Sequence, residues 1–196
     1  IHARTAAEVY GVPLEQVTHE MRSASKAVNF GIVYGISDFT LAKNISVSRK
    51  EAKEFIERYF ERYPGVKRYM DAAVAEGREK GYVTTLMGRR RYLPELASAN
   101  FNLRAFGERC AMNSPIQGTA ADIIKLAMIR VADALRKGGY KARLILQVHD
   151  ELIVEAPEDE QERVRALLKD CMDGVAALAV PLKTDISVGR DWRECK

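Results

Sequence analysis

Two cationic and two aromatic side chains recur at intervals of four residues in one stretch of the sequence. They are Arg22, Lys26, Phe30 and Tyr34. Four residues of an α-helix turn about 400°, so each side chain drifts only about 40° from the one before and all four share one broad face. Each step rises about 6 Å along the axis, which places the two cations ahead of the two rings.

This order matches the layout of a nucleotide, which has phosphates at one end and a sugar and base at the other. A guanidinium binds pairs of phosphate oxygens, a lysine adds a mobile point charge, and aromatic faces stack on bases or sugars. An aromatic stripe buried in a core, beside two solvated cations, also fits the spacing. The spacing alone favours this buried stripe.

Three consecutive polar residues, His149, Asp150 and Glu151, separate two β-rich runs over 143–148 and 152–155. The pattern predicts a hairpin with these polar residues at its tip. Phosphoryl transfer needs Mg²⁺ held by carboxylate oxygens, and a tip between rigid strands can supply them. Polar residues are also common in hairpin turns that bind nothing, and the local pattern alone favours such a turn.

Longer polar side chains recur every four residues at Arg109, Asn113 and Gln117. Donors spaced in this way can contact the minor groove of a duplex, where base acceptors lie in similar places in every correct pair. An exposed polar face of an amphipathic helix is the alternative. A separate basic group could touch template phosphates through charge alone or could simply be solvated. Its members are Lys67, Arg68, Arg89, Arg90 and Arg91.

The composition is that of a globular protein able to position such groups. With 196 residues, 47% of them hydrophobic, the chain can bury a core as one large domain or two coupled subdomains. A net charge of +4 indicates that any nucleic-acid contact comes from a local cluster. Three cysteines without a Cys-x-x-Cys pair argue against disulfides and zinc. We therefore expect a cytoplasmic protein with no membrane partner, because no run is apolar enough to span a bilayer.

Helices separated by marked breaks are predicted for the first two thirds of the chain. Thr18 is expected to cap a helix that reaches about Tyr34, where Gly35 stops it. A capping box over 48–51 begins another helix, which ends before Pro64. Further helices are predicted over about 3–10 and over about 102–112 and 119–137, with Pro115 forcing a break between the last two. Another helix is predicted after the Pro64-Gly65 break, closing at Gly81. A short hairpin is predicted between Tyr82 and Tyr92.

The last third has a mixed pattern. Beyond the hairpin around Asp150, we predict a helix over about 158–178 and a strand near 183–188. The fold class is therefore α+β, with a mostly helical part over 1–137 and a part over 138–196 that contains antiparallel strands.

Three stretches resemble motifs of family A DNA polymerases. Residues 22–35, Arg-Ser-Ala-Ser-Lys-Ala-Val-Asn-Phe-Gly-Ile-Val-Tyr-Gly, closely resemble the nucleotide-binding helix of that family. Residues 147–151, Gln-Val-His-Asp-Glu, resemble the C motif of the palm in its bacterial polymerase I branch. Residues 109–122 resemble the family almost throughout. The motifs follow the family's order, and the resemblance extends from His2 to about Trp192.

The resemblance implies roles for the residues of the first motif. Arg22 and Lys26 would hold the incoming triphosphate, and Lys26 would protonate the leaving pyrophosphate. Phe30 would lie against the sugar and base, and Tyr34 would stack at the templating position. His2 stands where the bacterial enzymes carry a histidine that touches phosphate. Phe30 in place of a tyrosine implies discrimination against nucleotides that lack a 3′-hydroxyl.

For the second motif, the resemblance implies that Asp150 is a metal ligand, that Glu151 is an auxiliary carboxylate and that His149 faces the primer terminus. The complete enzyme would use two Mg²⁺ ions. The first metal-binding Asp of the family lies upstream of the point where this chain begins, and neither 37–39 nor 184–186 has the neighbours or position of a substitute. We therefore expect the chain to lack a complete catalytic centre.

By the same resemblance, Arg109, Asn113 and Gln117 would contact the minor groove of the primer-template. Residues 1–137 would form the fingers and 138–196 the C-terminal part of the palm, so the thumb and the N-terminal palm become expected partners alongside DNA and deoxynucleoside triphosphates.

The predicted function is template-directed addition of deoxynucleotides to a primer 3′-hydroxyl in the bacterial cytoplasm. The alternatives are a non-catalytic nucleotide- or DNA-binding module and a helical protein-interaction domain. Departures from the family are small, chiefly Ser23 where many relatives have a second arginine, and Cys110 where methionine or a similar residue is common.

Overall fold

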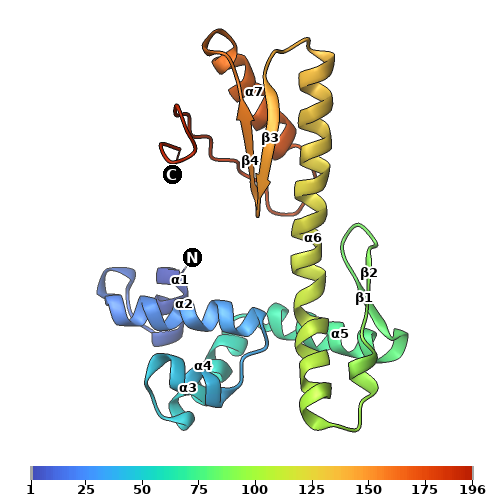
Figure 1. Cartoon of the computed structure of the whole chain (residues 1–196). Helices are drawn as coiled ribbons and strands as arrows, with labels where there is room; N and C mark the ends of the chain where they lie inside the picture. The colour runs from blue at the N-terminus through green and yellow to red at the C-terminus, as the bar shows by residue number, and fades with distance from the viewer. Residues whose placement is uncertain (1, 196) are drawn as a thin grey trace. The chain divides into compact units, whose positions relative to one another are not determined.

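The computed structural model describes residues 2–195, apart from the side chain of Val33. The chain divides into two compact units, the first ending at Ile116 and the second beginning at Gln117. As predicted, the fold is α+β: the described residues form mostly helices, with a two-stranded antiparallel sheet in each unit (Figure 1). The functional boundary expected at residue 137 stays a prediction, because compactness alone does not define it.

The first unit begins with helices whose predicted caps are present. The side chain of Thr18 accepts a hydrogen bond from the Met21 amide, and Ser48 and Glu51 form the reciprocal capping box. Gly81 ends the last of these helices with a φ of +75°. In chain order the elements are α1 (His2–Tyr10), the 3₁₀ turn η1 (Leu14–Gln16), α2 (His19–Val33), α3 (Asp38–Ile45), α4 (Arg49–Arg62) and α5 (Pro64–Lys80).

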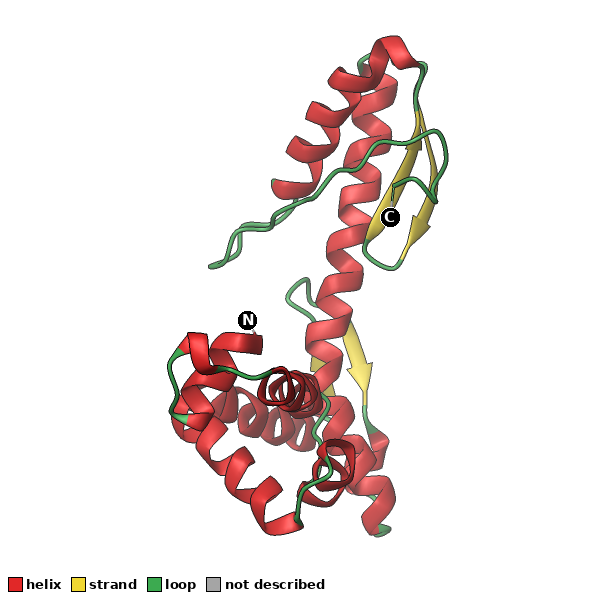
Figure 2. Cartoon of the chain, turned by 90° about the vertical axis from the view of Figure 1, so that its left-hand side faces the viewer, coloured by secondary structure: helices red, strands yellow, loops and turns green. Residues whose placement is uncertain are grey.

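The four helices α1, α2, α3 and α4 share one hydrophobic core, and this core fixes the orientation of α2. Val28 and Ile32 of α2 are almost completely buried together with Leu41 of α3 and Phe55 of α4. Figure 2 shows these helices packed as a group around that core. Because one face of α2 is buried, its opposite face is left for solvent or a ligand.

Helix α3 was not predicted from the sequence, although its first residues carry a start signal. The Ser37 hydroxyl accepts a hydrogen bond from the Thr40 amide, as an N-cap does. Asp38 accepts a hydrogen bond of 2.7 Å from Arg49 Nε, which ties α3 to α4. Asp38 therefore has a structural role in this unit.

The predicted hairpin between Tyr82 and Tyr92 is present as β1 (Tyr82–Thr84) and β2 (Arg90–Tyr92), and the 3₁₀ turn η2 (Pro94–Ala97) follows it. Val83 and Leu93 are buried in a second core with Ala111 of the long helix α6 (Phe101–Lys137). This core holds the first half of α6 against the rest of the first unit.

The break expected at Pro115 does not occur, because α6 runs continuously through this residue. A proline inside a helix removes one backbone hydrogen bond and costs about 3 kcal/mol. The helix continues because packing supports it on both sides: Ala111 is buried before the proline, and Ala127 and Val131 are buried after it. Tertiary packing outweighs the local preference of the proline.

In the second unit, the predicted hairpin around residue 150 is formed by β3 (Arg143–Val148) and β4 (Glu151–Glu155), with a register shift between Leu144 and Leu146. The 3₁₀ turn η3 (Glu158–Glu160) leads into α7 (Gln161–Asp173), which packs with the second half of α6 against one face of the hairpin. The buried Glu160 carboxylate accepts hydrogen bonds of 3.0 Å from the amides of Lys141 and Ala142. This contact anchors the loop that enters β3.

Two predictions for the last third were wrong in detail. Helix α7 ends at Asp173 rather than near residue 178, because Gly174 caps it. Residues 183–188 form no strand; instead, the Thr184 amide donates to the Asp173 carboxylate at 2.7 Å, which satisfies that amide without a sheet partner. A strand needs a neighbour, and β3 and β4 pair only with each other within residues 2–195.

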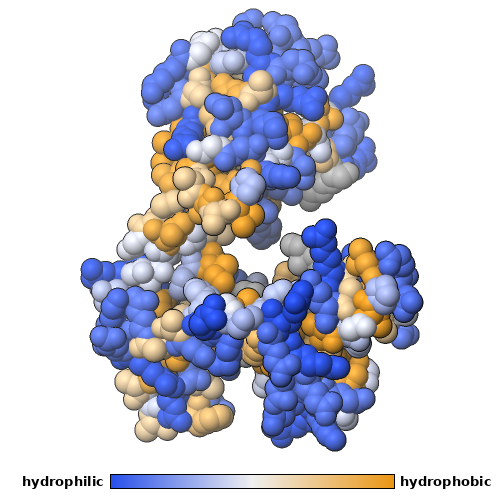
Figure 3. All heavy atoms as spheres, turned by 180° about the vertical axis from the view of Figure 1, so that it is seen from behind, coloured by the Kyte–Doolittle hydropathy of each residue, from blue (hydrophilic) through white to orange (hydrophobic). Residues whose placement is uncertain are grey.

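Some hydrophobic surface is exposed, as Figure 3 shows on one face of each unit. In the second unit, Ile129, Ile145 and Leu146 are 46–59% exposed. No helix within residues 2–195 combines the length and the apolar character needed to cross a membrane.

Candidate nucleotide and DNA interface

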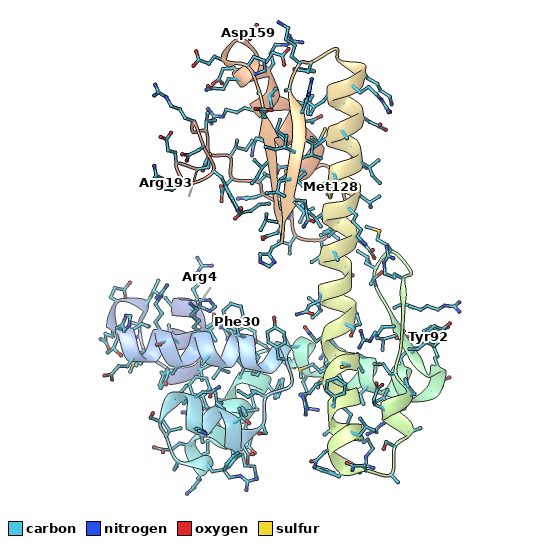
Figure 4. All side chains as sticks on the ribbon, viewed as in Figure 1. Arg4, Phe30, Tyr92, Met128, Asp159 and Arg193 are labelled. Atoms are coloured by element: carbon cyan, nitrogen blue, oxygen red, sulfur yellow. The ribbon has the colours of Figure 1, made fainter. Side chains whose placement is uncertain are left out.

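All four side chains of the cation and aromatic series lie on the exposed face of α2. Phe30 is 53% exposed and Tyr34 is 48% exposed, whereas Val28 and Ile32 on the other side of the helix are buried. Figure 4 shows Phe30 projecting from the side of α2 that faces away from α3 and α4. The aromatic pair is therefore not part of the core, and the buried-stripe explanation of its spacing is wrong.

The cations at the start of this face are available to an anion. Arg22 and Lys26 are exposed, and neither forms an ion pair within the described part of the chain. Two unpaired cations separated by one helical turn form a local positive site that an extended polyphosphate can bridge.

His2 joins this face from α1. Its ring lies 5.6 Å from the Phe30 ring, between centroids, and its Nδ1 atom lies 3.0 Å from Nδ2 of Asn29. Asn29 Nδ2 can only donate, so Nδ1 accepts and the neutral ring carries its proton on Nε2. Burial first, and then the positive charges of the amino terminus, Lys26 and Arg22, hold the His2 pKa below its usual value.

Asn29 is a residue of this site that the sequence pattern did not reveal. Its Nδ2 also donates to the Thr5 hydroxyl at 3.1 Å, so one amide ties the His2 ring and α1 to α2. The only sequence signal was an amide within the nucleotide-binding motif, beside the aromatic position. Asn29 fixes the direction in which the remaining ring nitrogen of His2 points.

The end of α2 adjoins the beginning of the polar series on α6. Gly35 adopts a left-handed conformation, with a φ of +67°. A Cβ atom on Gly35 would lie 2.6 Å from Met112 Cε and 2.9 Å from Arg109 Cγ. Glycine is thus required both by the backbone angle and by the close approach of α6. Tyr34, the C-cap of α2, and Arg109 consequently belong to neighbouring parts of the first unit.

Arg109 and Asn113 occupy successive turns of α6 in the first unit, and Gln117 follows on the same helix at the start of the second unit. Arg109 and Gln117 are exposed, whereas Asn113 is partly buried. The Asn113 Oδ1 atom is buried and has no hydrogen-bond partner among residues 2–195. With this acceptor buried, the Asn113 amide can act on DNA only as a donor, through Nδ2.

The tip of the β3–β4 hairpin is a tight turn. Val148 pairs with Glu151, so His149 and Asp150 alone form the loop. His149 has a φ of +52°, a left-handed conformation that is uncommon for a residue with a Cβ atom. The Gln147 side chain donates to the His149 carbonyl at 2.6 Å and holds this conformation. The strained turn presents the Asp150 side chain to solvent.

Glu151 has a hydrogen-bond partner far along the chain. Trp192 is 38% exposed, and its indole Nε1 donates to Glu151 Oε2 at 3.4 Å. One oxygen of the Glu151 carboxylate is therefore oriented by the C-terminal segment. No signal in the sequence pointed to this pair, because 41 residues separate its members.

The donor set at the tip fits a magnesium ion. Mg²⁺ prefers carboxylate oxygens, and it is usually held by one or two of them together with substrate phosphates and water. Asp150 and Glu151 are exposed and adjacent, and the Glu151 Oε1 atom is not engaged by Trp192. Within residues 2–195, no group of three His, Cys, Asp or Glu side chains is arranged to hold a metal.

Comparison with known proteins places these features in one family. The profile of DNA polymerase family A matches residues 1–194, and the chain belongs to that family. Relatives include DNA polymerase I of Bacillus caldotenax, 58% identical over the whole chain, and DNA polymerase I of Bacillus subtilis, 57% identical. The chain spans 22% of the length of each of these relatives.

A solved structure has the same fold. It is the POL domain of Pol1 from M. smegmatis in complex with DNA primer-template and dNTP, with a TM-score of 0.94 and 44% sequence identity. The match covers 99% of this chain and 34% of that one. Family membership and fold therefore agree with the motifs read from the sequence.

Proposed function

We propose that the chain supplies the nucleotide-binding face and part of the catalytic centre of a bacterial, cytoplasmic DNA-directed DNA polymerase. In the complete enzyme, the primer 3′-hydroxyl attacks the α-phosphate of a deoxynucleoside triphosphate and pyrophosphate leaves. One observation carries the proposal: Arg22, Lys26, Phe30 and Tyr34 are all exposed on one face of a helix whose other face is buried. The family and a relative bound to primer-template and dNTP support it.

In this proposal α2 binds the nucleotide along its length. Arg22 and Lys26 pair with the triphosphate, and the Lys26 ammonium gives a proton to the departing pyrophosphate oxygen. The His2 Nε2–H donates to a phosphate oxygen. Phe30 packs on the sugar and base and disfavours nucleotides without a 3′-hydroxyl, and Tyr34 stacks at the templating position.

The hairpin tip holds the metal and faces the primer. Asp150 would be the direct ligand and Glu151 the auxiliary carboxylate, with two Mg²⁺ ions in the complete centre. When bound, the ions neutralise phosphate charge and make the 3′-hydroxyl a stronger nucleophile. His149 faces the primer terminus, while Arg109, Asn113 and Gln117 donate to minor-groove acceptors of the primer-template.

The proposal also assigns the chain a partner in the rest of the polymerase. Asp150 and Glu151 sit together at one tip, and two metal ions need ligands on more than one side. The thumb and N-terminal palm would supply the remaining carboxylate and the rest of the DNA contacts. We therefore expect the 196-residue chain alone to bind nucleotides without extending primers.

Nucleotide binding is tested on the chain itself by titrating a fluorescent deoxynucleoside triphosphate. Lys26→Ala should weaken binding roughly tenfold or more, because a hydrogen bond to a charged group contributes about 1.5–3 kcal/mol. Lys43→Ala is the matched control, since Lys43 is an exposed lysine on α3 that forms no hydrogen bond or ion pair through its side chain within residues 2–195. Equal losses of nucleotide affinity in both variants would mean that only the net charge of the chain matters. That result would contradict the proposed site.

Catalysis is tested in a chimera in which this chain replaces the matching segment of the Bacillus caldotenax DNA polymerase I. The chimera should extend a primer in Mg²⁺, and Asp150→Asn should abolish extension while the Kd for the nucleotide changes little. A chimera that folds and binds nucleotide but extends nothing would instead support the alternative of a non-catalytic binding module.

A further inference from the structure

A tyrosine outside the known motifs is hydrogen-bonded to the backbone of the helix that carries the polar series. The hydroxyl of Tyr69, on α5, donates to the carbonyl oxygen of Met112, on α6, at 3.1 Å. The Tyr69 side chain is 38% exposed, and partial burial raises its pKa, so the hydroxyl remains a donor at neutral pH. This contact links two helices of the same unit.

The acceptor lies in the turn of α6 that Pro115 deprives of one backbone hydrogen bond. In an α-helix each carbonyl accepts from the amide four residues later. Pro115 has no amide hydrogen, so the Ala111 carbonyl receives no bond from it, and the ring crowds that carbonyl. Met112 is the next residue along this weakened turn. Tyr69 and Pro115 also line one small cavity of about 150 Å³, which places Tyr69 beneath the proline turn.

The same turn fixes two of the residues proposed to contact DNA. Met112 stands between Arg109 and Asn113, so a rotation at Met112 would displace both. The position of Asn113 is sensitive, because its Oδ1 atom is buried without a partner in the described part of the chain and only its donor group can serve a base acceptor. On the other side, Met112 and Arg109 are packed against Gly35 at the end of α2.

We propose that Tyr69 is a positioning residue for the check of base-pair shape: its hydrogen bond to the Met112 carbonyl holds Arg109 and Asn113 at the depth where they meet minor-groove acceptors. Correct pairs present these acceptors in shared positions and mismatched pairs displace them. If the turn were looser, Arg109 and Asn113 could move with the displaced acceptors of a mismatched pair. The mismatch would then be tolerated. The inference rests on the proposed function and deepens it, because it names a determinant of fidelity outside the DNA-contacting residues.

The test uses Tyr69→Phe in the chimera described above, because this change removes only the hydroxyl. The measured quantity is kcat/KM for extension from a matched primer terminus divided by kcat/KM from a mismatched one. We expect this ratio to fall roughly two- to tenfold, the range that loss of one hydrogen bond produces, mainly through faster extension of mismatched termini. An unchanged ratio, or an equal loss on both primers, would overturn the proposal, since a purely structural defect slows both reactions alike.

Two further variants separate the proposed route from general effects. Tyr59→Phe is the matched control, because it removes a hydroxyl from a tyrosine of the same unit that is buried in the core of α1 to α4, and it should leave the ratio unchanged. Pro115→Ala restores an amide hydrogen to α6, so adding Tyr69→Phe to it should have a smaller effect than in the wild type. Effects of equal size in both backgrounds would contradict the role of the turn. A wild-type chimera without extension would instead refute the proposed function.

Discussion

Phe30 and Tyr34 gain their functional meaning from their exposure. An aromatic stripe at helical spacing usually marks a core, and the spacing cannot distinguish a core from a binding face. In this chain α2 contributes Val28 and Ile32, on its opposite face, to the core, which leaves both rings about half exposed. In the proposed function, a nucleotide would supply complementary partners both for the exposed rings and for the adjacent cations.

The charge state of His2 gives a test at the level of one residue. Burial and nearby cations lower its pKa, so the folded state prefers the neutral ring. The neutral His2 ring therefore contributes to the free energy of unfolding above the unfolded-state pKa, near 6.5. This contribution is lost as the pH falls through the lower folded-state pKa. NMR titration of the His2 ring should therefore give a midpoint below 6.5.

Removing one of the cations should move that midpoint upward. Lys26→Gln deletes a positive charge that lowers the His2 pKa, whereas Lys43→Gln deletes one from α3 that does not act on it. The shift should be partial, because burial is the larger cause. A His2 midpoint that is the same in wild type and Lys26→Gln would show that the two side chains are not neighbours in solution.

The indole of Trp192 is expected to tune the auxiliary carboxylate. Trp192→Phe keeps an aromatic ring but removes the donor to Glu151 Oε2. Because Glu151 would lose one constraint on its orientation, the chimera should need a higher Mg²⁺ concentration for half-maximal extension, by about two- to threefold for one weak hydrogen bond. Primer extension measured across a Mg²⁺ series checks this, and no shift would mean that Glu151 is oriented by other groups.

At the scale of elements, the junction between α2 and α6 depends on a glycine. At Gly35 an alanine would be strained by the left-handed backbone and would also collide with Met112 and Arg109. We expect Gly35→Ala to lower the free energy of unfolding by about 1–3 kcal/mol, measured by urea denaturation.

The matched control for this prediction is Gly11→Ala. Gly11 has a φ of +68°, almost the same angle, but a Cβ atom there would meet nothing within 4 Å. It therefore carries the conformational cost without the steric one. Gly35→Ala should be the more destabilising of the two variants, and equal losses would show that α6 yields readily at Arg109 and Met112.

Local chemistry explains which elements could be predicted from the sequence. The caps at Thr18 and Ser48, the glycine stop at Gly81 and both hairpins are set by residues close together in the chain, and all are present. The continuity of α6 through Pro115 could not be predicted, because it depends on packing against distant elements. For the same reason the strand expected over 183–188 is absent: its pattern was suitable, but the amide of Thr184 is bonded to Asp173.

The residues of the candidate site also divide into those set by local sequence and those set by contacts between distant residues. The exposed series on α2 and the tip at Asp150 lie within short motifs and could be identified from their residues. The supporting contacts join residues far apart in the chain: Asn29 to His2, Trp192 to Glu151, and Tyr69 to the Met112 carbonyl. Sequence spacing carries no information about such pairs, so only the fold reveals them.

For the whole molecule, the two compact units have separate cores, and this predicts separable stability. Leu41 is buried in the helical core of the first unit and Leu135 in the core formed by α6, α7 and the β3–β4 hairpin. Truncating either leucine to alanine should cost about 2–5 kcal/mol within its own unit. The single tryptophan, Trp192, lies in the second unit and reports on that unit alone.

In urea, Leu135→Ala should shift the transition seen by Trp192 fluorescence, whereas Leu41→Ala should shift the circular dichroism transition of the helices and leave the fluorescence midpoint nearly unchanged. If Leu41→Ala moved both midpoints equally, the chain would unfold as one cooperative body through α6.

The β3–β4 hairpin has a consequence for how the isolated chain behaves in solution. Its two strands pair only with each other within residues 2–195, and Ile145 and Leu146 of β3 are about half exposed. Unpaired strand edges next to apolar side chains are templates for intermolecular sheet growth. Preparations of this chain by itself should therefore form oligomers that increase with concentration and storage time.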